Sequence, residues 1–278
     1  MQNQLFKLAP ALRARWMKLA DQAPLSPRLP LRLHGLVVGS VAQSLVHFLS
    51  RTGVDLHWHE MTDHEGRCLH IPDDPAPTFA AIHQVLQQHG SIVWPVMEYL
   101  PILGANAQDL GPVPRGLARF LGLNTQSVHL VGWQEDVAWV QKRADNKTED
   151  PGLLDTLVGG TVAWGENPCV TLEREIWEEA GLSMRQLKAL TSYGAVKIKK
   201  PSLDPEGWGY QIETVHCLSA QVLPGIHPVN QDGEVAEFHS FRAEELSHAL
   251  ETERFTLAAT GVYLQLTQAI PASAVIKP

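Results

Sequence analysis

The stretch of this 278-residue chain whose residue types best suit chemistry is an acidic segment in its second half. Five Glu and one Arg fall within residues 160–182, which read GTVAWGENPCVTLEREIWEEAGL. Asn167 suits a helix N-cap, Pro168 suits the first helical position, and Gly181 suits the left-handed residue after a last turn. We therefore expect one well-delimited helix over 168–180.

Three carboxylates share one flank of this expected helix. At about 100° per residue, Glu175, Glu178 and Glu179 lie beside, rather than opposite, an apolar stripe. The stripe consists of Cys169, Leu172, Ile176 and Ala180. Like charges three and four residues apart repel, and a hard divalent cation bound by oxygen ligands would offset that cost. The alternative is a solvated acidic face that binds nothing.

The wider pattern resembles the Nudix box, G-x5-E-x7-R-E-U-x-E-E-x-G-U, where U is a bulky aliphatic residue. Every specified position is matched, by Gly160, Glu166, Arg174, Glu175, Ile176, Glu178, Glu179, Gly181 and Leu182. The resemblance implies an α/β/α sandwich around a mixed β-sheet, and a hydrolase that cleaves a diphosphate. It does not replace the argument from charge, since a diphosphate would be repelled by these carboxylates unless metal ions lay between them.

The resemblance also implies roles for single residues. In the family, the counterparts of Glu175, Glu178 and Glu179, often joined by that of Glu166, hold Mg²⁺ or Mn²⁺. The counterpart of Arg174 orients catalytic carboxylates through a salt bridge. The counterpart of Gly160 gives the loop its turn and lies at the substrate.

The general base and the phosphate-binding groups stay open at this point. The family takes its base either from the position of Glu175 or from a distal loop, for which Glu234 and Glu237 are the candidates. Just before the box, the cations of a basic segment could bind substrate phosphates or form a solvated loop. They are Lys142, Arg143 and Lys147.

Residues outside the box resemble the Nudix hydrolases associated with thiamine pyrophosphokinase. These carry a P-G-x-L-D-x-x-V-G-G approach, matched over 151–160, a D-G-E-V segment, matched over 232–235, and an N-terminal domain of about 120 residues. The resemblance implies thiamine diphosphate or an oxidised analogue as substrate and a monophosphate as product. Trp164, a large aromatic residue inside the loop of the box, departs from the pattern. Three tryptophans could stack on a thiazolium ring or belong to the core; they are Trp133, Trp139 and Trp208.

Other functions compete with this interpretation. One alternative is a pyrophosphatase for ADP-ribose or another nucleoside diphosphate derivative, and another is a Nudix-like module that only senses a ligand. A third is an isomerase of the isopentenyl diphosphate type, which needs a catalytic cysteine. Cys169, in the expected buried stripe, is poorly placed for that role.

Composition and charge limit the class of protein. The chain is 44% hydrophobic and 19% charged, which excludes wholesale disorder. Its net charge of −8 divides into +1 for residues 1–124 (10 Lys+Arg, 9 Asp+Glu) and −9 for 125–278 (12 and 21). This acidity argues against a nucleic-acid partner. Three cysteines without C-x-x-C spacing indicate a reducing compartment, and no run of 18 apolar residues occurs, so we expect a soluble cytoplasmic protein without a membrane partner. A homodimer is an open alternative.

The order of elements predicts an α+β fold in two parts. We expect an accessory α+β domain over 1–124 and the Nudix domain over 125–278. The first part should hold an amphipathic helix in its first twenty residues, a linker over 24–30, strands over 31–39 and 54–60, helices over 41–49, 78–89 and 115–121, and a loop over 104–114. The second part should hold strands over 128–133, 137–141, 153–158, 190–198, 210–218 and 237–241, and further helices over 243–250 and 256–268.

A histidine-rich segment in the first part is a weaker candidate for a metal site. His57, His59, His64 and Cys68 are zinc-type ligands, and Asp63, Glu65 and His70 lie among them. Their spacing matches no zinc pattern. A polar strand edge with a turn explains the same residues without a metal.

Overall fold

A mixed seven-stranded sheet forms the centre of the second part of the chain. The structure is a computed structural model that describes residues 8–63, 66–92 and 98–268. Its main sheet has the order β11-β12-β7-β8-β13, with β10 paired to β7 and β9 to β8. Strands β12 and β7 are parallel, and every other pair is antiparallel. The strands are β7 (Asn124–Gln134), β8 (Val137–Arg143), β9 (Leu154–Asp155), β10 (Val158–Thr161), β11 (Leu187–Pro201), β12 (Tyr210–Val222) and β13 (Val235–Arg242).

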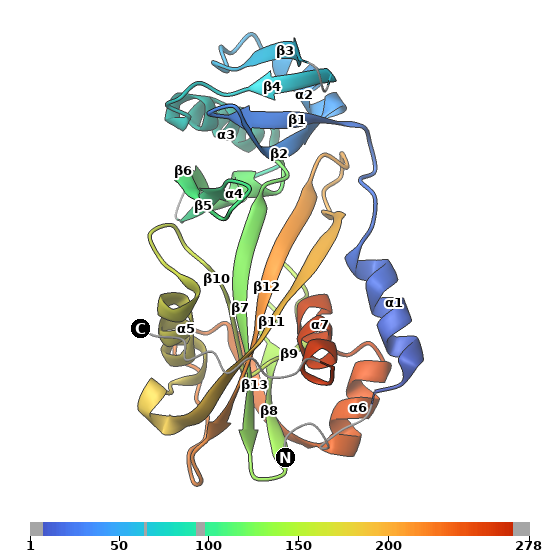
Figure 1. The fold of residues 1–278 in the computed structure, drawn as a ribbon, viewed down its shortest axis with the longest axis vertical. Helices are drawn as coiled ribbons and strands as arrows, with labels where there is room; N and C mark the ends of the chain where they lie inside the picture. Colours follow the sequence, from blue (N-terminus) through green and yellow to red (C-terminus); the bar gives the residue numbers. More distant parts are fainter. Residues whose placement is uncertain (1–7, 64–65, 93–97, 269–278) are drawn as a thin grey trace.

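Helices cover both faces of this sheet (Figure 1). On one face α5 (Pro168–Ala180) packs on β7 and β10 over a core that includes Leu130 and Ile176. On the other face α6 (Ala243–Glu251) and α7 (Leu257–Leu266) cover a separate core that includes Val140 and Tyr263. The predicted α/β/α sandwich with a mixed sheet is confirmed.

The first part of the chain has its own sheet and core. Strands β1 (Arg28–Leu33), β2 (Leu36–Ala42), β3 (His59–Asp63) and β4 (Gly66–His70) pair in the order β2-β1-β4-β3. Helices α2 (Gln43–Ser50) and α3 (Ala76–His89) pack on this sheet, and the hairpin of β5 (Tyr99–Leu103) and β6 (Asp109–Pro114) leads into the short α4 (Arg115–Ala118). Hairpin and α4 lie between this sheet and the main sheet (Figure 1).

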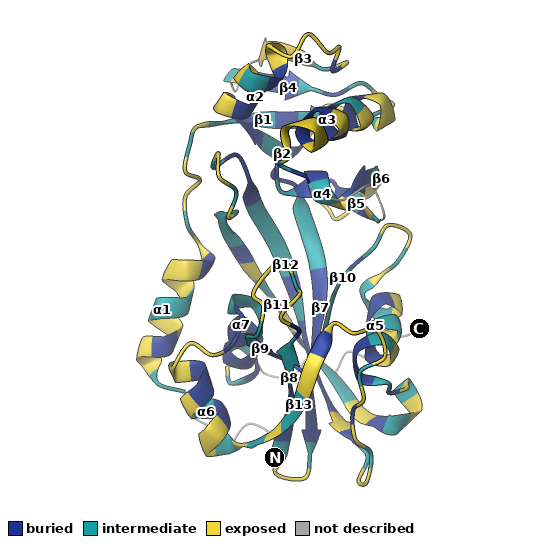
Figure 2. Cartoon of the chain, turned by 180° about the vertical axis from the view of Figure 1, so that it is seen from behind, coloured by how far each residue is buried: buried dark blue, intermediate teal, exposed yellow. Residues whose placement is uncertain are grey.

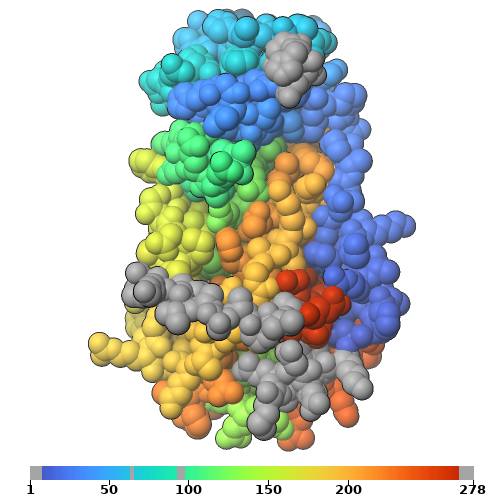
Figure 3. All heavy atoms as spheres, in the orientation of Figure 1, coloured from blue at the N-terminus to red at the C-terminus, as the bar shows by residue number. Residues whose placement is uncertain are grey.

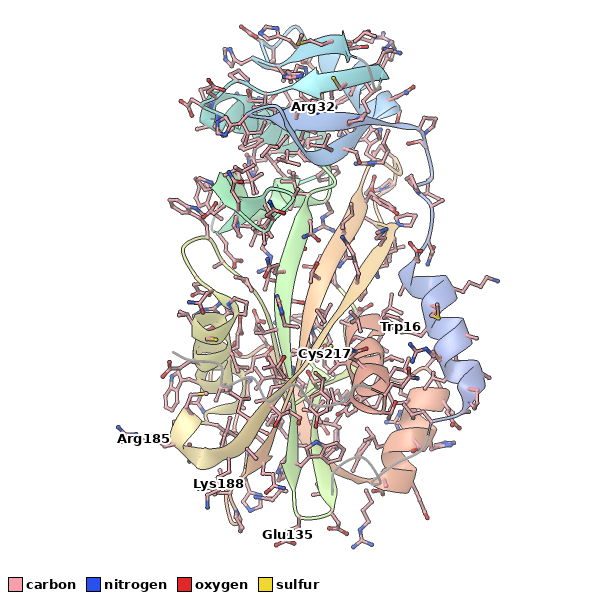
Figure 4. The ribbon with its side chains drawn as sticks, viewed as in Figure 1. Trp16, Arg32, Glu135, Arg185, Lys188 and Cys217 are labelled. Carbon is pink, nitrogen blue, oxygen red and sulfur yellow. The ribbon has the colours of Figure 1, made fainter. Side chains whose placement is uncertain are left out.

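Helix α1 (Pro10–Ala20) packs on the second part of the chain, although it comes first in sequence. The Trp16 indole N–H donates to the Leu257 carbonyl oxygen at 2.8 Å. Its ring lies so close to Gly261 of α7 that a Cβ there would overlap it. Figure 4 shows Trp16 between α1 and α7, and Figure 2 shows the exposed residues of α1 on its outer side. Leu12 and Ala20 thus belong to the core beneath α7.

The turn between β11 and β12 reaches the other way, into the core of the first part. Trp208, 6% exposed, packs there against Phe48, with ring centroids 4.9 Å apart. The Arg28 guanidinium donates to the carbonyl oxygens of Trp208 (2.6 Å), Ser40 (2.6 Å) and Phe120 (3.1 Å). Burial lowers the pKa of Arg28 to about 10. One half-buried cation therefore joins β2, the residue Phe120 after α4 and the β11–β12 turn.

Three local predictions were wrong. The segment over 24–30 is not all linker, because β1 begins at Arg28. Pro30 is tolerated in this strand because only β2 pairs with it; β4 pairs with β1 only from Leu31 onward, so the missing N–H of Pro30 breaks no ladder. The strand expected over 54–60 begins only at His59. The loop expected over 104–114 ends in β6, which β5 pairs in spite of two prolines.

The structure agrees with the other predicted elements to within a few residues at their ends, except for the strand expected over 153–158. That segment is divided between β9 and β10, which pair with β8 and β7 respectively. Gly90 closes α3 with φ +85°, as its position predicted. None of the helices formed by the described residues is long and apolar enough to cross a membrane.

Candidate active site

Helix α5 is held at both ends by the residues that its sequence predicted. The Asn167 side chain accepts hydrogen bonds from the backbone N–H groups of Cys169 (2.9 Å) and Val170 (3.1 Å). Gly181 follows the last turn with φ +61°. Cys169 is half-buried rather than buried, which corrects the predicted stripe; Thr171 is the buried residue of that turn. The helix is thus a fixed support for its carboxylates.

Arg174 lies at the centre of the acidic residues. Its Nε and Nη2 bind the two oxygens of Glu166, at 2.9 and 3.0 Å. Its Nη1 donates to Glu175 Oε1 and to Glu178 Oε2, each at 2.8 Å. These hydrogen bonds, above all those with Glu166, raise the pKa of Arg174. One permanent cation therefore orients three of the four carboxylates of the box.

Both carboxylate oxygens of Glu166 already accept hydrogen bonds. Besides its two bonds to Arg174, its Oε2 accepts the Thr171 hydroxyl at 2.7 Å. The hydrogen bonds from Arg174 hold the pKa of Glu166 below its ordinary value. In this arrangement Glu166 anchors the arginine.

Glu175 is packed against the backbone of β10. A Cβ at Gly160 would overlap the Glu175 carboxylate, so only glycine allows this contact. The side chain is 12% exposed. Burial raises the pKa of Glu175 to about 7. The negative charges of Glu178 and Glu234 also raise this pKa, whereas the positive charge of Arg174 lowers it.

Glu179 is the most buried carboxylate of the group, with 2% of its surface exposed. Its Oε2 accepts the Gly159 backbone N–H at 2.8 Å and the Gln141 side-chain N–H at 3.1 Å. Burial raises its pKa well above the ordinary value. Sequence analysis missed Gln141; its place in β8, opposite Phe238 of β13, gave no signal of this contact.

The donor set fits a hard divalent cation such as Mg²⁺ or Mn²⁺. Three of the carboxylates each keep one oxygen that accepts no hydrogen bond from any described residue. These oxygens are Glu175 Oε2, Glu178 Oε1 and Glu179 Oε1. Carboxylate oxygens are the ligands that such cations prefer. Within the described part of the chain, however, no three acidic, histidine or cysteine side chains converge closely enough to enclose an ion. Arg174 occupies the space between three of the acids.

The two candidate distal bases lie in different places. Glu234 forms an ion pair with Lys147 and influences the pKa of Glu175, so both belong to the α5 side of the sheet. Glu237 pairs with Lys142 at 3.5 Å. Alternation along β8 places Lys142 on the face opposite Gln141, hence away from Glu179. A separate pocket is lined by Lys142, Gly152, Leu153, Leu154, Glu237, His239, Glu253 and Arg254.

Arg143 is mostly buried and holds the loop over 144–152. It donates to the Glu149 carbonyl oxygen through Nε (3.3 Å) and Nη2 (3.0 Å), and its Nη1 lies 3.5 Å from Asp155. Asp155 also lies 3.3 Å from His129 Nδ1. Burial disfavours both charges, yet each partner stabilises the other, so the pKa of His129 is raised and that of Asp155 lowered. His129 carried no sequence signal of this role.

The remaining predicted residues do not join the site. His57 lies 3.3 Å from Asp55, Cys68 is buried, and His64 and Glu65 lie outside the described residues. Trp133 and Trp208 are buried in separate cores, and Trp139 is half-buried with its indole N–H on Gln134. Trp164, within the box loop, is 49% exposed.

Comparison with known proteins identifies the second part of the chain. The family model described as NUDIX domain matches residues 124–259. Two curated relatives from Arabidopsis thaliana are Nudix hydrolase 20, chloroplastic (27% identical; 67% of this chain, 50% of the relative) and Nudix hydrolase 24, chloroplastic (26%; 66% and 51%). The solved structure of DR0079 from Deinococcus radiodurans is 16% identical, with a TM-score of 0.47, over 61% of this chain and 98% of that chain. The chain spans about half the length of the curated relatives it matches. The family model identifies residues 124–259 as a Nudix domain.

Proposed function

We propose that this chain is a divalent-metal-dependent hydrolase that cleaves a diphosphate joined to an organic group. One observation carries the proposal: α5 gathers Glu166, Glu175 and Glu178 around Arg174, with Glu179 beside them, in the complete pattern of the Nudix box. Thiamine diphosphate or an oxidised analogue is the first substrate to test, and ADP-ribose or another nucleoside diphosphate derivative is the alternative.

The reaction adds water across a P–O–P linkage. The water oxygen forms a new bond to one phosphorus, the bridging P–O bond breaks, and the water proton passes to a carboxylate; for thiamine diphosphate the products are the monophosphate and phosphate. Glu178 and Glu179 would hold Mg²⁺ or Mn²⁺ through their free oxygens, with Glu166 fixing Arg174. Glu175 would be a further metal ligand only if another carboxylate accepted the proton. The bound metal supplies charge neutralisation of the phosphates and a water of lowered pKa.

Glu175 is our choice for the proton acceptor. Its pKa of about 7 suits a base near neutral pH, and its Oε2 is free. Glu234 is the second choice because Lys147 neutralises it, and Glu237 lies towards the other face of the sheet.

The first test replaces one proposed metal-binding carboxylate by an amide of the same size. Glu178→Gln should lower metal-dependent release of phosphate by about two to four orders of magnitude, the range for a removed catalytic group. Glu173→Gln is the matched control, because Glu173 lies on the same helix but is exposed and forms no ion pair among the described residues. Retained activity in Glu178→Gln, with an unchanged melting temperature, would show that the box is not the catalytic centre.

A substrate screen then separates the two substrate classes. Thiamine diphosphate and ADP-ribose are compared at equal concentration with Mg²⁺ and with Mn²⁺. A clear preference for thiamine diphosphate supports a thiamine-type substrate, and equal rates of hydrolysis of the two compounds contradict it.

Three further expectations stay proposals. The boundary near Asn124 is supported by the separate cores on its two sides, although α1 packs with the second of them. We propose a cytoplasmic location, which fractionation of cells tests, while the names of the two relatives describe them as chloroplastic. Sedimentation of the full chain tests the homodimer.

A further inference from the structure

The first part of the chain reaches the Nudix box. The Trp164 backbone N–H, in the loop that joins β10 to α5, donates to the Tyr99 carbonyl oxygen at 2.8 Å. Figures 1 and 2 both show the β5–β6 hairpin and α4 beside this loop, and in Figure 3 their surface adjoins that of the box segment. Residues contributed by the first 124 positions therefore border the proposed catalytic centre.

Arg115, at the start of α4, is a cation of the first part that reaches the box segment. Its backbone N–H donates to the Glu98 carbonyl oxygen at 3.0 Å, and its Nη1 donates to Glu98 Oε2 at 2.5 Å. Its Nη2 lies 3.4 Å from Thr161 Oγ1. Thr161 directly follows Gly160, against which the Glu175 carboxylate packs. The guanidinium is thus held over the end of β10, one residue from the contact with Glu175.

This guanidinium keeps donors for a ligand. Arginine has five N–H donors, and Nη1 and Nη2 each use one of theirs. Nε has no acceptor among the residues that the structure describes, and the side chain is 55% exposed. Burial would lower its pKa, but the carboxylates of Glu98, Glu149 and Glu234 together raise it, so the charge is permanent.

Further ion pairs stand next to this one. Arg119, four residues further on, binds Glu149 at 3.1 Å, and Lys147 pairs with Glu234, which itself influences Glu175. Each of these cations is therefore paired with a carboxylate. Guanidinium groups bind phosphate oxygens in a forked geometry, and an incoming diphosphate could replace such partners.

We propose that Arg115 is a substrate-binding residue that the first part of the chain supplies to the Nudix domain, where it binds non-bridging oxygens of an organic diphosphate. Arg119 is its secondary partner. The inference rests on the proposed function and explains why the accessory part adjoins the box, because its cations hold the diphosphate that the acidic helix alone would repel.

The test measures binding and turnover on the full-length chain. Affinity for methylenediphosphonate, a non-hydrolysable probe, is measured by calorimetry with Mg²⁺ present, and KM and kcat are measured on the best diphosphate of the screen. Arg115→Ala should weaken probe binding and raise KM at least about ten-fold, the loss of roughly one charged hydrogen bond, with kcat within about three-fold. Arg115→Lys, which keeps the charge but not the fork, should fall between.

Two controls separate substrate binding from a structural role. Arg67→Ala removes another half-exposed arginine of the first part that is paired with a glutamate, Glu60, and should change neither quantity. Glu98→Gln removes the partner but leaves Arg115 in place, and should bind the probe at least as tightly as the wild type. If the Arg115–Glu98 pair were only structural, Glu98→Gln would weaken binding as much as Arg115→Ala.

The outcomes distinguish this inference from the proposed function. Probe binding by Arg115→Ala within two-fold of wild type overturns the inference, whatever the turnover. A wild-type chain that binds the probe through Arg115 but hydrolyses no diphosphate overturns the proposed reaction and supports the binding site. A wild type that does not bind the probe at millimolar concentration overturns the inference.

Discussion

Three carboxylates of the box differ in pKa although their residue type is the same. Two bonds to Arg174 hold the pKa of Glu166 below its ordinary value, whereas burial raises the pKa of Glu175 to about 7 and that of Glu179 well above its ordinary value. Without a metal, the acids nearest β10 thus tend to keep protons that a cation must displace. Metal binding and proton release are coupled for this reason.

This difference predicts a pH-dependent cost in stability. Glu175 has a folded-state pKa of about 7 against an ordinary value of 4.5. The folded chain then binds more protons than the unfolded chain, so stability falls as pH rises from about 4.5 through about 7. Glu175→Gln cannot ionise, and in EDTA it should be more stable than wild type at pH 8 by up to about 3 kcal/mol, but not at pH 5. Urea unfolding at both pH values measures this, and an equal difference at both would contradict it.

Much of the site could be predicted from residue types, but not the state of each residue. The pattern from Gly160 to Leu182 predicted which carboxylates gather, and they do gather around Arg174. It could not predict that Glu179 binds Gln141, or that Lys142 and Glu237 lie towards the other face, because these depend on the pairing of β8 with distant strands. Arg115 was missed because only the fold brings it to Thr161.

At the scale of elements, Asp155 joins segments that the helix pattern does not reveal. Lying in β9, it accepts the Thr156 backbone N–H at 2.8 Å and the hydroxyl of Thr256, the N-cap of α7, at 3.3 Å. It also binds His129 of β7 and Arg143 of β8.

Local signals such as caps and closing glycines predicted α3 and α5 closely. They could not predict β6 or the start of β1, where pairing with a neighbouring strand outweighs proline content.

Asp155→Asn should therefore loosen several elements at once. It leaves Arg143 and His129 without the charge of the carboxylate that they share, and breaking a buried ion pair in this way costs about 3–5 kcal/mol. Urea unfolding at pH 7 checks the loss. Asp150→Asn, an exposed acid in the adjacent loop, is the control and should change stability by less than about 0.5 kcal/mol. Equal stability of the two variants would show that the cluster around Asp155 is not a structural centre.

At the scale of the whole molecule, each part of the chain inserts into the other. Helix α1 packs on α7, and the β11–β12 turn places Trp208 in the first core. The sequence predicted that α1 has an apolar face, but an apolar face does not specify its partner. Arg119 of the first part pairs with Glu149 of the acidic second part, and Arg115 reaches Thr161 of the box segment.

Arg28 tests whether this exchange holds the two parts together. Arg28→Met keeps a long apolar side chain but removes the donors to Trp208, Ser40 and Phe120, leaving three carbonyl oxygens without a charged partner. Hydrogen bonds to charged groups contribute about 1.5–3 kcal/mol each, and part of that is recovered because the desolvation cost of the half-buried cation is also removed. We expect a net loss of about 2–4 kcal/mol.

Because the three segments come from both parts, urea unfolding should also separate into two transitions, seen by tryptophan fluorescence and by circular dichroism. Arg51→Met, an exposed arginine after α2, should keep a single wild-type transition. A single unshifted transition in Arg28→Met would mean that apolar contact at Trp208 is enough to join the parts, and that the arginine adds nothing to their coupling.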